Sequence, residues 1–266
     1  MNCYGTLTQL KANLGITATT DNAILLRCLE GASRLIDSFC NRSFYVWEGA
    51  KYFDGASPLF ITDLLAESEF KTDEDGDLDY DNTLATTDYI LYPLNDFPKT
   101  YIRLTPDSNY SGFGGSVKKG AKITGKWGYG DGISATPCEV TSVTVTVADA
   151  TATTLTLSAE GTIEAGHTIL VESEQMYISA VTADGTMGAT AERAVNGTTG
   201  AAHSAKAASI YKYPRDVCQA CLQAAETLFE TRGKVFSSER LGDYSYTAKE
   251  AALELGTLVY YRRIGL

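Results

Sequence analysis

The stretch between Pro137 and Pro214 differs in composition from the rest of the chain, and this change constrains the fold more than any other feature. Thr, Ala, Val and Gly dominate it, and Tyr177 and Tyr211 are among its few aromatic residues. Short runs of alternating apolar and polar residues are separated by turn residues, a pattern typical of small all-β folds. The sequence therefore predicts a small all-β module over residues 137–213.

The two borders of this module share a pattern. PCEV at 137–140 and PRDV at 214–217 both read proline, any residue, acid, valine. The second copy suits the start of a helix, because Pro214 fits the first turn and Asp216 the positive end of the helix dipole. The first copy leads only into strand-like sequence. This duplicated junction indicates that the module was inserted where a strand once led directly into the helix.

The N-terminal sequence predicts two helices. Thr6 and Gln9 have the spacing of a capping box at the start of a short amphipathic helix that ends at Gly15. The second helix is expected to end near Asn41. Its apolar positions recur every three or four residues, as on the buried face of a helix, at Leu25, Leu29, Ala32, Leu35, Ile36 and Phe39.

The C-terminal sequence predicts two more helices. One begins at Pro214 and runs to about Arg232, with Gly233 as its stop signal. The other is expected from about Thr247 to the chain end, after a loop at 237–244. These helices and the N-terminal pair predict a core that is mainly a helical bundle.

Residues 44–128 form a β-rich segment. Gly, Pro, Asn and Asp separate its aromatic and β-branched runs. From Val117 to Trp127 apolar and polar residues alternate, which predicts a strand with one buried face. The other runs are 44–47, 59–61, 89–92 and 101–104.

The predicted fold class is therefore α+β. A mainly helical core, made of residues 1–136 and 214–266, contains the β-rich segment at about 44–128. The all-β module at 137–213 is inserted into this core.

Composition and charge limit the classes of function. Apolar residues make up 44% and charged residues 21%, which is ordinary for a globular protein. The net charge of -11 argues against wrapping nucleic acid through phosphate contacts, although it allows a protein that lines a DNA passage without gripping it. No apolar run reaches the roughly 18 residues of a membrane-spanning helix, and the N-terminus lacks a signal-peptide pattern. The six scattered cysteines are expected as reduced thiols in a cytoplasm.

The chain offers little material for catalysis. His167 and His203 are its only histidines, and both are expected at the surface or in turns. Cys218 and Cys221 are expected to pack on an apolar helix face, because no second pair of ligands is near. The glycines at 115–120 lack the lysine of a phosphate-binding loop. The sequence therefore predicts a protein that is not an enzyme and has no cofactor.

A run of alternating aspartates from Asp73 to Asp81 suggests a calcium-binding loop. However, Asn82 stands where the EF-hand loop requires glycine, and Asp88 stands where it requires glutamate. The flanking sequence favours strands or loops over helices. A solvated acidic loop without a metal is the prediction.

Several motifs in this order resemble the head-tail connector (adaptor) family of long-tailed bacteriophages. They are YxTLxxLKxxLGI at 4–16, the helix at 25–44, DYILYPLN at 88–95, KITGKWGYGDG at 122–132, and the proline-initiated helix followed by SERLGDYSY at 238–246. The module at 137–213 departs from the compact pattern of that family.

The resemblance implies a structural protein of the phage neck. Members are largely helical, form a homo-oligomeric ring, commonly of twelve copies, beneath the portal protein, and extend the DNA channel towards the tail. The implied partners are the portal and the next neck, head-closure or tail protein. DNA is expected to pass without sequence-specific binding. The expected location is the virion neck, after assembly in the host cytoplasm and without contact with a membrane.

The resemblance also implies that the C-terminal segment reaches into the portal. The candidate portal-binding residues are Tyr260, Tyr261, Arg262, Arg263, Ile264 and Leu266. Tyrosine and arginine are favoured anchors at protein interfaces, and a chain end is normally polar. The alternative is that this segment packs on its own domain.

A second class of function stays open. The chain could instead be a binding protein of the virion or tail surface whose β-module recognises a glycan or a decoration partner. Sugar sites usually carry exposed Trp or Tyr rings for stacking, and the module has few aromatic residues. A ring of about twelve copies favours the connector, whereas a monomer or trimer retained on a glycan array favours the alternative.

Overall fold

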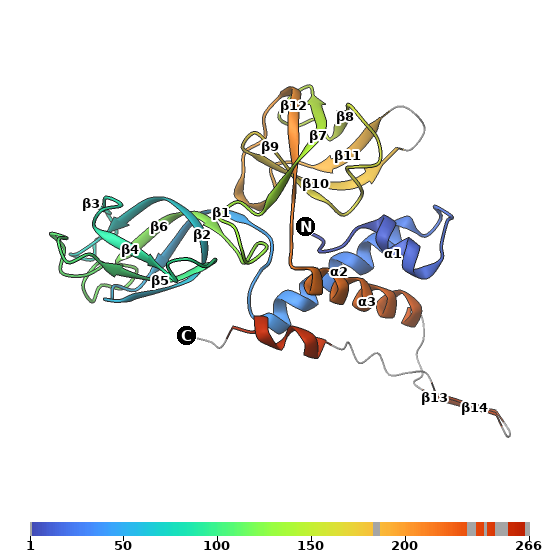
Figure 1. Cartoon of the computed structure of the whole chain (residues 1–266), viewed down its shortest axis with the longest axis horizontal. Helices are drawn as coiled ribbons and strands as arrows, with labels where there is room; N and C mark the ends of the chain where they lie inside the picture. Colours follow the sequence, from blue (N-terminus) through green and yellow to red (C-terminus); the bar gives the residue numbers. More distant parts are fainter. Residues whose placement is uncertain (1, 183–186, 233–237, 242–243, 248–254, 264–266) are drawn as a thin grey trace.

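A computed structural model describes residues 2–182, 187–232, 238–241, 244–247 and 255–263. The chain forms three bodies (Figure 1). A helical body contains helices from the first and last parts of the chain, a sheet domain lies to one side of it, and a closed β-barrel lies against the helices.

The first helix, α1 (Leu7–Leu14), has the predicted capping box. The backbone N–H of Gln9 donates to the Thr6 side chain, and the Gln9 side chain accepts from the backbone N–H of Thr6. Gly15 ends the helix with φ of 65°, a left-handed conformation that glycine adopts without steric cost. The prediction for this helix is confirmed.

The helices α2 (Asn22–Cys40) and α3 (Arg215–Thr231) pack together and form most of the helical core. Asn41 ends α2 in a left-handed conformation, as its position predicts. Most predicted apolar positions of α2 are buried, but Leu35 is 39% exposed. Leu35 precedes Ile36 by one residue, so it points away from the face that Ile36 buries.

The sheet domain contains six strands in the order β1-β6-β2-β5-β4, and β3 pairs with β2. All pairs are antiparallel. The strands are β1 (Trp47–Phe53), β2 (Leu59–Thr72), β3 (Asn82–Thr83), β4 (Tyr89–Tyr92), β5 (Lys99–Leu104) and β6 (Ala121–Trp127).

The predicted half-buried strand begins later than its sequence pattern suggests. Strand β6 alternates between buried and half-buried residues, as predicted. It begins at Ala121 because Lys119 has a φ of 56° and the N–H of Gly120 donates to the carbonyl of Val117 in a turn. The pattern upstream of this turn therefore does not extend the strand.

The predicted β-module is a closed antiparallel barrel with the strand order β10-β11-β8-β7-β12-β9. Its strands are β7 (Cys138–Val147), β8 (Thr154–Leu157), β9 (Thr168–Val171), β10 (Glu174–Val181), β11 (Gly188–Glu192) and β12 (His203–Tyr211). The first and last strands pair, and Cys138 lies opposite Tyr211. The chain therefore enters and leaves the barrel at adjacent points.

The barrel packs closely on the helical body. Tyr177 of β10 is 1% exposed and belongs to the helical core, where its hydroxyl donates to Glu30 Oε1 at 2.9 Å. The N–H of Leu7 donates to the carbonyl of Ala165 at 2.9 Å. Aromatic, polar and backbone contacts therefore fix the barrel to α1 and α2.

The predicted final helix is wrong in its extent. Strands β13 (Ser238–Leu241) and β14 (Tyr244–Thr247) form a hairpin, and a 3-10 helix, η2 (Leu255–Tyr261), follows. Tyrosine and threonine favour strands, and Gly256 lowers the propensity for a regular helix. The predicted stop at Gly233 lies outside the described residues. The fold class α+β with a β-barrel module is confirmed.

Candidate functional site

The C-terminal segment, residues 255–263, was the first candidate for an interface. It contains η2, which packs on the helical body through Leu258, a fully buried member of the helical core. The segment runs past the end of α2, because the N–H of Arg263 donates to the carbonyl of Cys40 at 2.8 Å. Some side chains of the segment therefore face the protein and others face away from it.

Tyr261 points towards the protein. Its hydroxyl donates to Asp216 Oδ1 at 2.9 Å. Its ring makes edge contacts with Phe44 and Tyr129, with ring centroids 5.5 and 5.3 Å apart. Tyr261 thus ties the chain end to α3 and to the start of the sheet domain.

Arg263 also points towards the protein, and its side chain is 16% exposed. Its guanidinium donates to the carbonyl of Ile61 at 2.6 Å and lies 3.7 Å from the carboxylate of Asp63. Arg42 lies 3.5 Å from the same carboxylate. Burial raises the pKa of Asp63 above its ordinary value, although both arginines oppose this shift. The contacts of Arg263 and Tyr261 are those expected if the segment packs on its own domain.

The remaining described candidates point away from the protein. Tyr260 is 94% exposed, and Arg262 is exposed beside it. Val259 is 52% exposed. Ile264 and Leu266 lie outside the described residues. The structure thus separates an outward pair, Tyr260 and Arg262, from an inward pair, Tyr261 and Arg263, that contacts the rest of the subunit.

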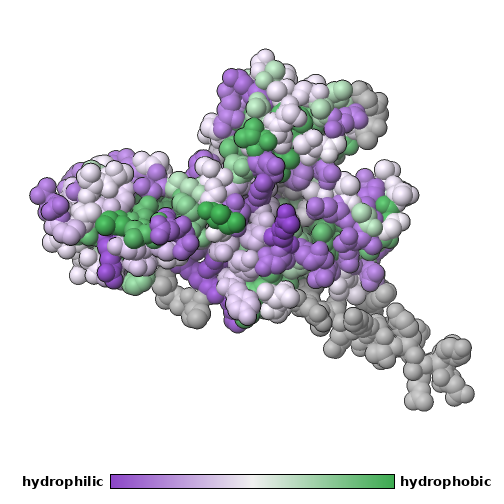
Figure 2. All heavy atoms as spheres, viewed as in Figure 1, coloured by the Kyte–Doolittle hydropathy of each residue, from purple (hydrophilic) through white to green (hydrophobic). Residues whose placement is uncertain are grey.

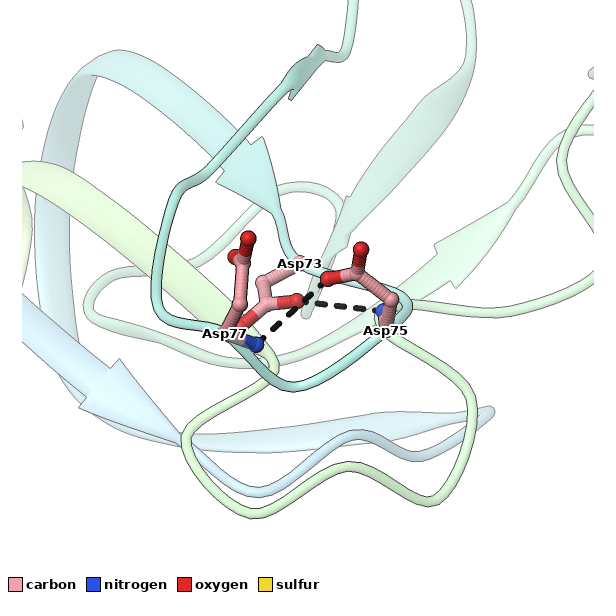
Figure 3. Close-up of side chains that lie close together, drawn as sticks. All are labelled: Asp73, Asp75 and Asp77. Atoms are coloured by element: carbon pink, nitrogen blue, oxygen red, sulfur yellow. Dashed lines mark hydrogen bonds between the residues drawn. The ribbon is translucent and has the colours of Figure 1, made fainter.

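The acidic loop, residues 73–81, was the second candidate. Carboxylate oxygens of Asp73, Asp75 and Asp77 lie within 4.8 Å of one another (Figure 3). Asp73 is 1% exposed, and its oxygens accept the backbone N–H groups of Gly76 at 2.7 Å and Leu78 at 2.8 Å. These hydrogen bonds, that of Gly76 above all, lower the pKa of Asp73. Its carboxylate therefore shapes the loop between β2 and β3.

We expect the acidic loop to bind no calcium ion tightly, because both oxygens of Asp73 already accept backbone N–H groups and no closing glutamate follows. Isothermal titration of the protein with calcium should show no binding in the micromolar range. Asp75→Asn is the matched control, because it removes one of the clustered carboxylates. If the loop has no calcium site, the unchanged protein and this variant should give the same titration. A micromolar site that Asp75→Asn abolishes would show the prediction to be wrong.

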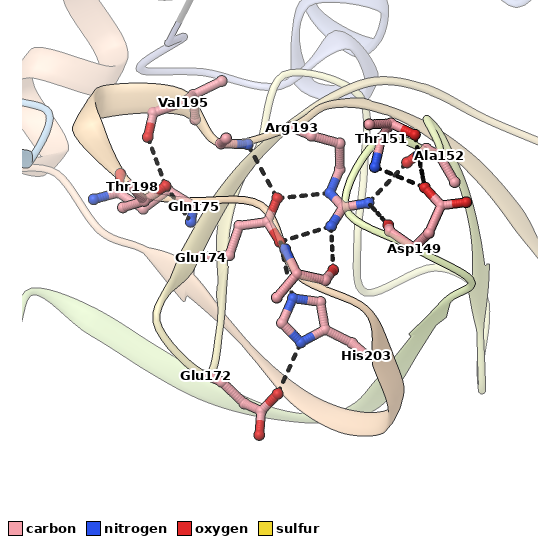
Figure 4. Close-up of polar contacts among 12 residues, drawn as sticks. Asp149, Thr151, Ala152, Glu172, Glu174, Gln175, Arg193, Val195, Thr198 and His203 are labelled. Atoms are coloured by element: carbon pink, nitrogen blue, oxygen red, sulfur yellow. Dashed lines mark hydrogen bonds and ion pairs between the residues drawn. The ribbon is translucent and has the colours of Figure 1, made fainter.

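A buried ion pair inside the barrel was not predicted. Arg193 donates to both carboxylate oxygens of Glu174, at 2.7 and 2.6 Å, and the two side chains are 5% and 0% exposed (Figure 4). The remaining N–H groups of Arg193 donate to the carbonyls of Asp149, Ala152 and Ala201. Every guanidinium donor thus has an acceptor, so the pair fixes the connection between β11 and β12 to the barrel.

His203 belongs to the same network, and its expected position at the surface or in a turn is wrong. It lies on β12, is 3% exposed, and places Nδ1 2.8 Å from Glu172 and Nε2 2.9 Å from Glu174. Burial alone would raise the pKa of Glu174, but hydrogen bonds from Arg193, His203 and backbone N–H groups hold it at about 2. Local sequence patterns carry little signal for this contact, because about thirty residues separate the partners.

Other candidates from the sequence have structural roles. Cys221 is buried and its Sγ lies 3.3 Å from the hydroxyl of Ser33, while Cys218 is half-buried, so the pair packs as predicted. All six cysteines are free. Tyr177 and Tyr211 are 1% and 6% exposed, so neither offers a ring face to a glycan.

The comparison with known families concerns the region that contains α1, α2 and the strands to β4. Residues 4–96 match the model of the phage gp6-like head-tail connector protein family. This region of the chain belongs to the head-tail connector family. The family predicted from the sequence motifs is therefore confirmed, and its members are structural proteins of the phage virion. No curated protein and no solved structure shows significant similarity to the chain. None of the helices in the described ranges is long and apolar enough to span a bilayer.

Proposed function

We propose that this protein is a structural head-tail connector that forms a ring beneath the portal, extends the DNA channel and provides the attachment site for the tail. The match of residues 4–96 to the connector family carries this proposal. Its partners are further copies of itself, commonly twelve in all, the portal protein and the next neck or tail protein. It acts in the virion neck after assembly in the host cytoplasm.

The charge of the chain suits a DNA passage. A protein that grips DNA neutralises phosphates with clustered Lys and Arg, and its affinity depends on the counterions that are released. A net charge of -11 does not favour such binding. An acidic ring lets the genome pass without sequence-specific contact.

The outward side chains of the C-terminal segment are the proposed contact with the portal. Tyr260 and Arg262 combine an exposed ring with a guanidinium, the two groups most frequent among residues that dominate binding energy. Tyr261 and Arg263 hold the segment in place from the other side. Ile264 and Leu266 would extend the contact beyond the described residues.

We expect the double variant Tyr260→Ser with Arg262→Ser to fold normally but to fail in head-tail joining. Each lost anchor should weaken portal binding by about 2 kcal/mol, or roughly thirtyfold. The measurement is a complementation assay with phage lacking this gene, scored as infectious yield and as tailless heads by electron microscopy. Thermal unfolding of the purified variant should match that of the unchanged protein.

The matched control is Tyr261→Ser with Arg263→Ser, which removes the inward contacts and is expected to lower the unfolding temperature. Normal infectious yield with the outward variant would show that Tyr260 and Arg262 do not dock on the portal. A lowered unfolding temperature of the outward variant would assign these residues to the fold of the subunit instead.

We also propose that residues 137–213 are an insertion into a connector core made of residues 1–136 and 214–266. The pairing of Cys138 with Tyr211 supports this division, because it brings the two ends of the barrel together. A core strand could therefore continue into α3 without the barrel.

A further inference from the structure

One face of the sheet domain carries a row of aromatic side chains across three neighbouring strands. Phe60 of β2 lies opposite Tyr101 of β5, which lies opposite Tyr92 of β4. The rings of Tyr92 and Tyr101 stack with centroids 4.9 Å apart, and Phe60 lies 5.9 Å from Tyr101. Phe60 is 55% exposed. Figure 2 shows apolar residues exposed on the surface of the sheet domain.

A positive charge lies on the aromatic row. The guanidinium of Arg103 lies 5.8 Å from the ring of Tyr101 and 6.0 Å from that of Tyr92. Arg103 is exposed, and its guanidinium lies beside these two rings. Aromatic rings with an arginine among them are the composition of an interface centre rather than of an ordinary surface. A carboxylate from another molecule could reach this guanidinium.

The acidic loop has the complementary composition. Leu78 is 55% exposed and lies between the exposed carboxylates of Asp77 and Asp79. Its φ of 70° is a left-handed conformation that costs a non-glycine residue about 1–2 kcal/mol. The hydrogen bond from its N–H to Asp73 Oδ2, at 2.8 Å, maintains that conformation. The loop thus presents an apolar side chain flanked by negative charges.

The loop and the aromatic row lie at opposite ends of the same strand. Phe60 is the second residue of β2, and the loop follows its last residue, Thr72. The strand bends between them, because its register shifts at several points and Phe70, near its end, stacks on Phe113, which pairs with Ala56 just before the strand. Strand β3, which follows the loop, lies at the outer part of the sheet domain (Figure 1). In the single chain Phe60 stays 55% exposed, so the loop does not cover the aromatic row of its own copy.

We infer that the acidic loop of one copy docks on the aromatic row of the next copy. Leu78 packs on the rings of Phe60 and Tyr101, and Asp77 and Asp79 lie beside Arg103. Two different surfaces meet in this contact, so it is head-to-tail, and repeated contacts of this kind close into a ring when the rotation allows. The inference rests on the proposed ring and names the surfaces that build it.

Two single variants test the contact. Leu78→Asn removes the apolar side chain and keeps a residue that tolerates the left-handed conformation. Phe60→Ser removes the exposed ring from the aromatic row. Sedimentation velocity over a concentration series, with negative-stain microscopy, should show rings of the unchanged protein and at least a tenfold weaker association of each variant. Ile133→Ser and Val140→Ser are matched controls, because these apolar side chains are 81% and 74% exposed elsewhere.

A mixture distinguishes head-to-tail contacts from symmetric ones. The Leu78→Asn copy keeps its aromatic row and the Phe60→Ser copy keeps its loop, so an equal mixture should form dimers and no rings. Rings of either variant equal to those of the unchanged protein would overturn the contact and leave the proposed ring standing. An unchanged protein that stays monomeric at every concentration would also overturn the contact. The complementation assay with the Tyr260 and Arg262 variant tests the connector function separately.

Discussion

Replacing Arg193 with Met is expected to lower the free energy of unfolding of the barrel by about 3–5 kcal/mol. Met fills a similar volume, but it leaves the carboxylate of Glu174 buried with a missing partner and frees the carbonyls that Arg193 binds. Removal of one member of a buried ion pair costs more than the pair itself contributes, because the remaining charge stays away from water. Urea unfolding followed by circular dichroism measures the loss.

Lys206→Met is the matched control. Lys206 pairs with Glu172 at 2.8 Å, but the two side chains are 48% and 46% exposed, so the loss should stay below about 1 kcal/mol. Equal losses from the two variants would show that the buried pair has no special role.

The stability of the barrel should also depend on pH. The pKa of Glu174, at about 2, lies below its ordinary value of 4.5. The contribution of Glu174 to the free energy of unfolding is therefore complete above pH 4.5 and is lost as the pH falls towards 2.

Excision of Cys138 to Tyr211, with a short Gly-Ser link in their place, is expected to leave a folded but weaker core. The link has little to span, because these two residues lie opposite each other on paired strands. The free energy of unfolding should nevertheless fall by about 3–5 kcal/mol, because the ring of Tyr177 leaves the helical core. Thermal and urea unfolding of the shortened chain measure both effects.

Tyr177→Ala in the full chain is the control for this excision, because it empties the same part of the core while the barrel remains. If the barrel is an insertion, the excision should weaken the core at least as much as Tyr177→Ala does, because it also removes Ala165 and its hydrogen bond with Leu7. A shortened chain without cooperative unfolding would refute the division into a core and an inserted module.

Much of the fold could be predicted because the relevant signals are local. The capping box at Thr6 and the left-handed stop at Asn41 depend on a few neighbouring residues, and so do the strand patterns of β4 and β6. Leu35 was misplaced because a helix that packs on one side buries a narrower stripe than its apolar residues suggest. The hairpin before η2 lies mostly in the predicted loop, because its short strands, SERL and YSYT, are mostly polar and show no clear apolar alternation.

The candidate site could be predicted only in part. The sequence singled out the C-terminal tyrosines and arginines, but it could not separate Tyr260 from Tyr261. That separation depends on Asp216 and Phe44, which lie far away in the sequence. The ion pair of Arg193 and Glu174 was missed for the same reason: a closed barrel brings the two residues together, and no local pattern marks them.

Three of the thiols described above, those of Cys3, Cys40 and Cys221, are buried. Burial raises the pKa of each, that of Cys40 to about 11. Oxidants attack the thiolate form, and access is needed for the attack. A virion component must persist outside the cell in the presence of oxygen and peroxides. Burial of these three thiols would protect them from oxidation between hosts, with neither disulfides nor a reductant.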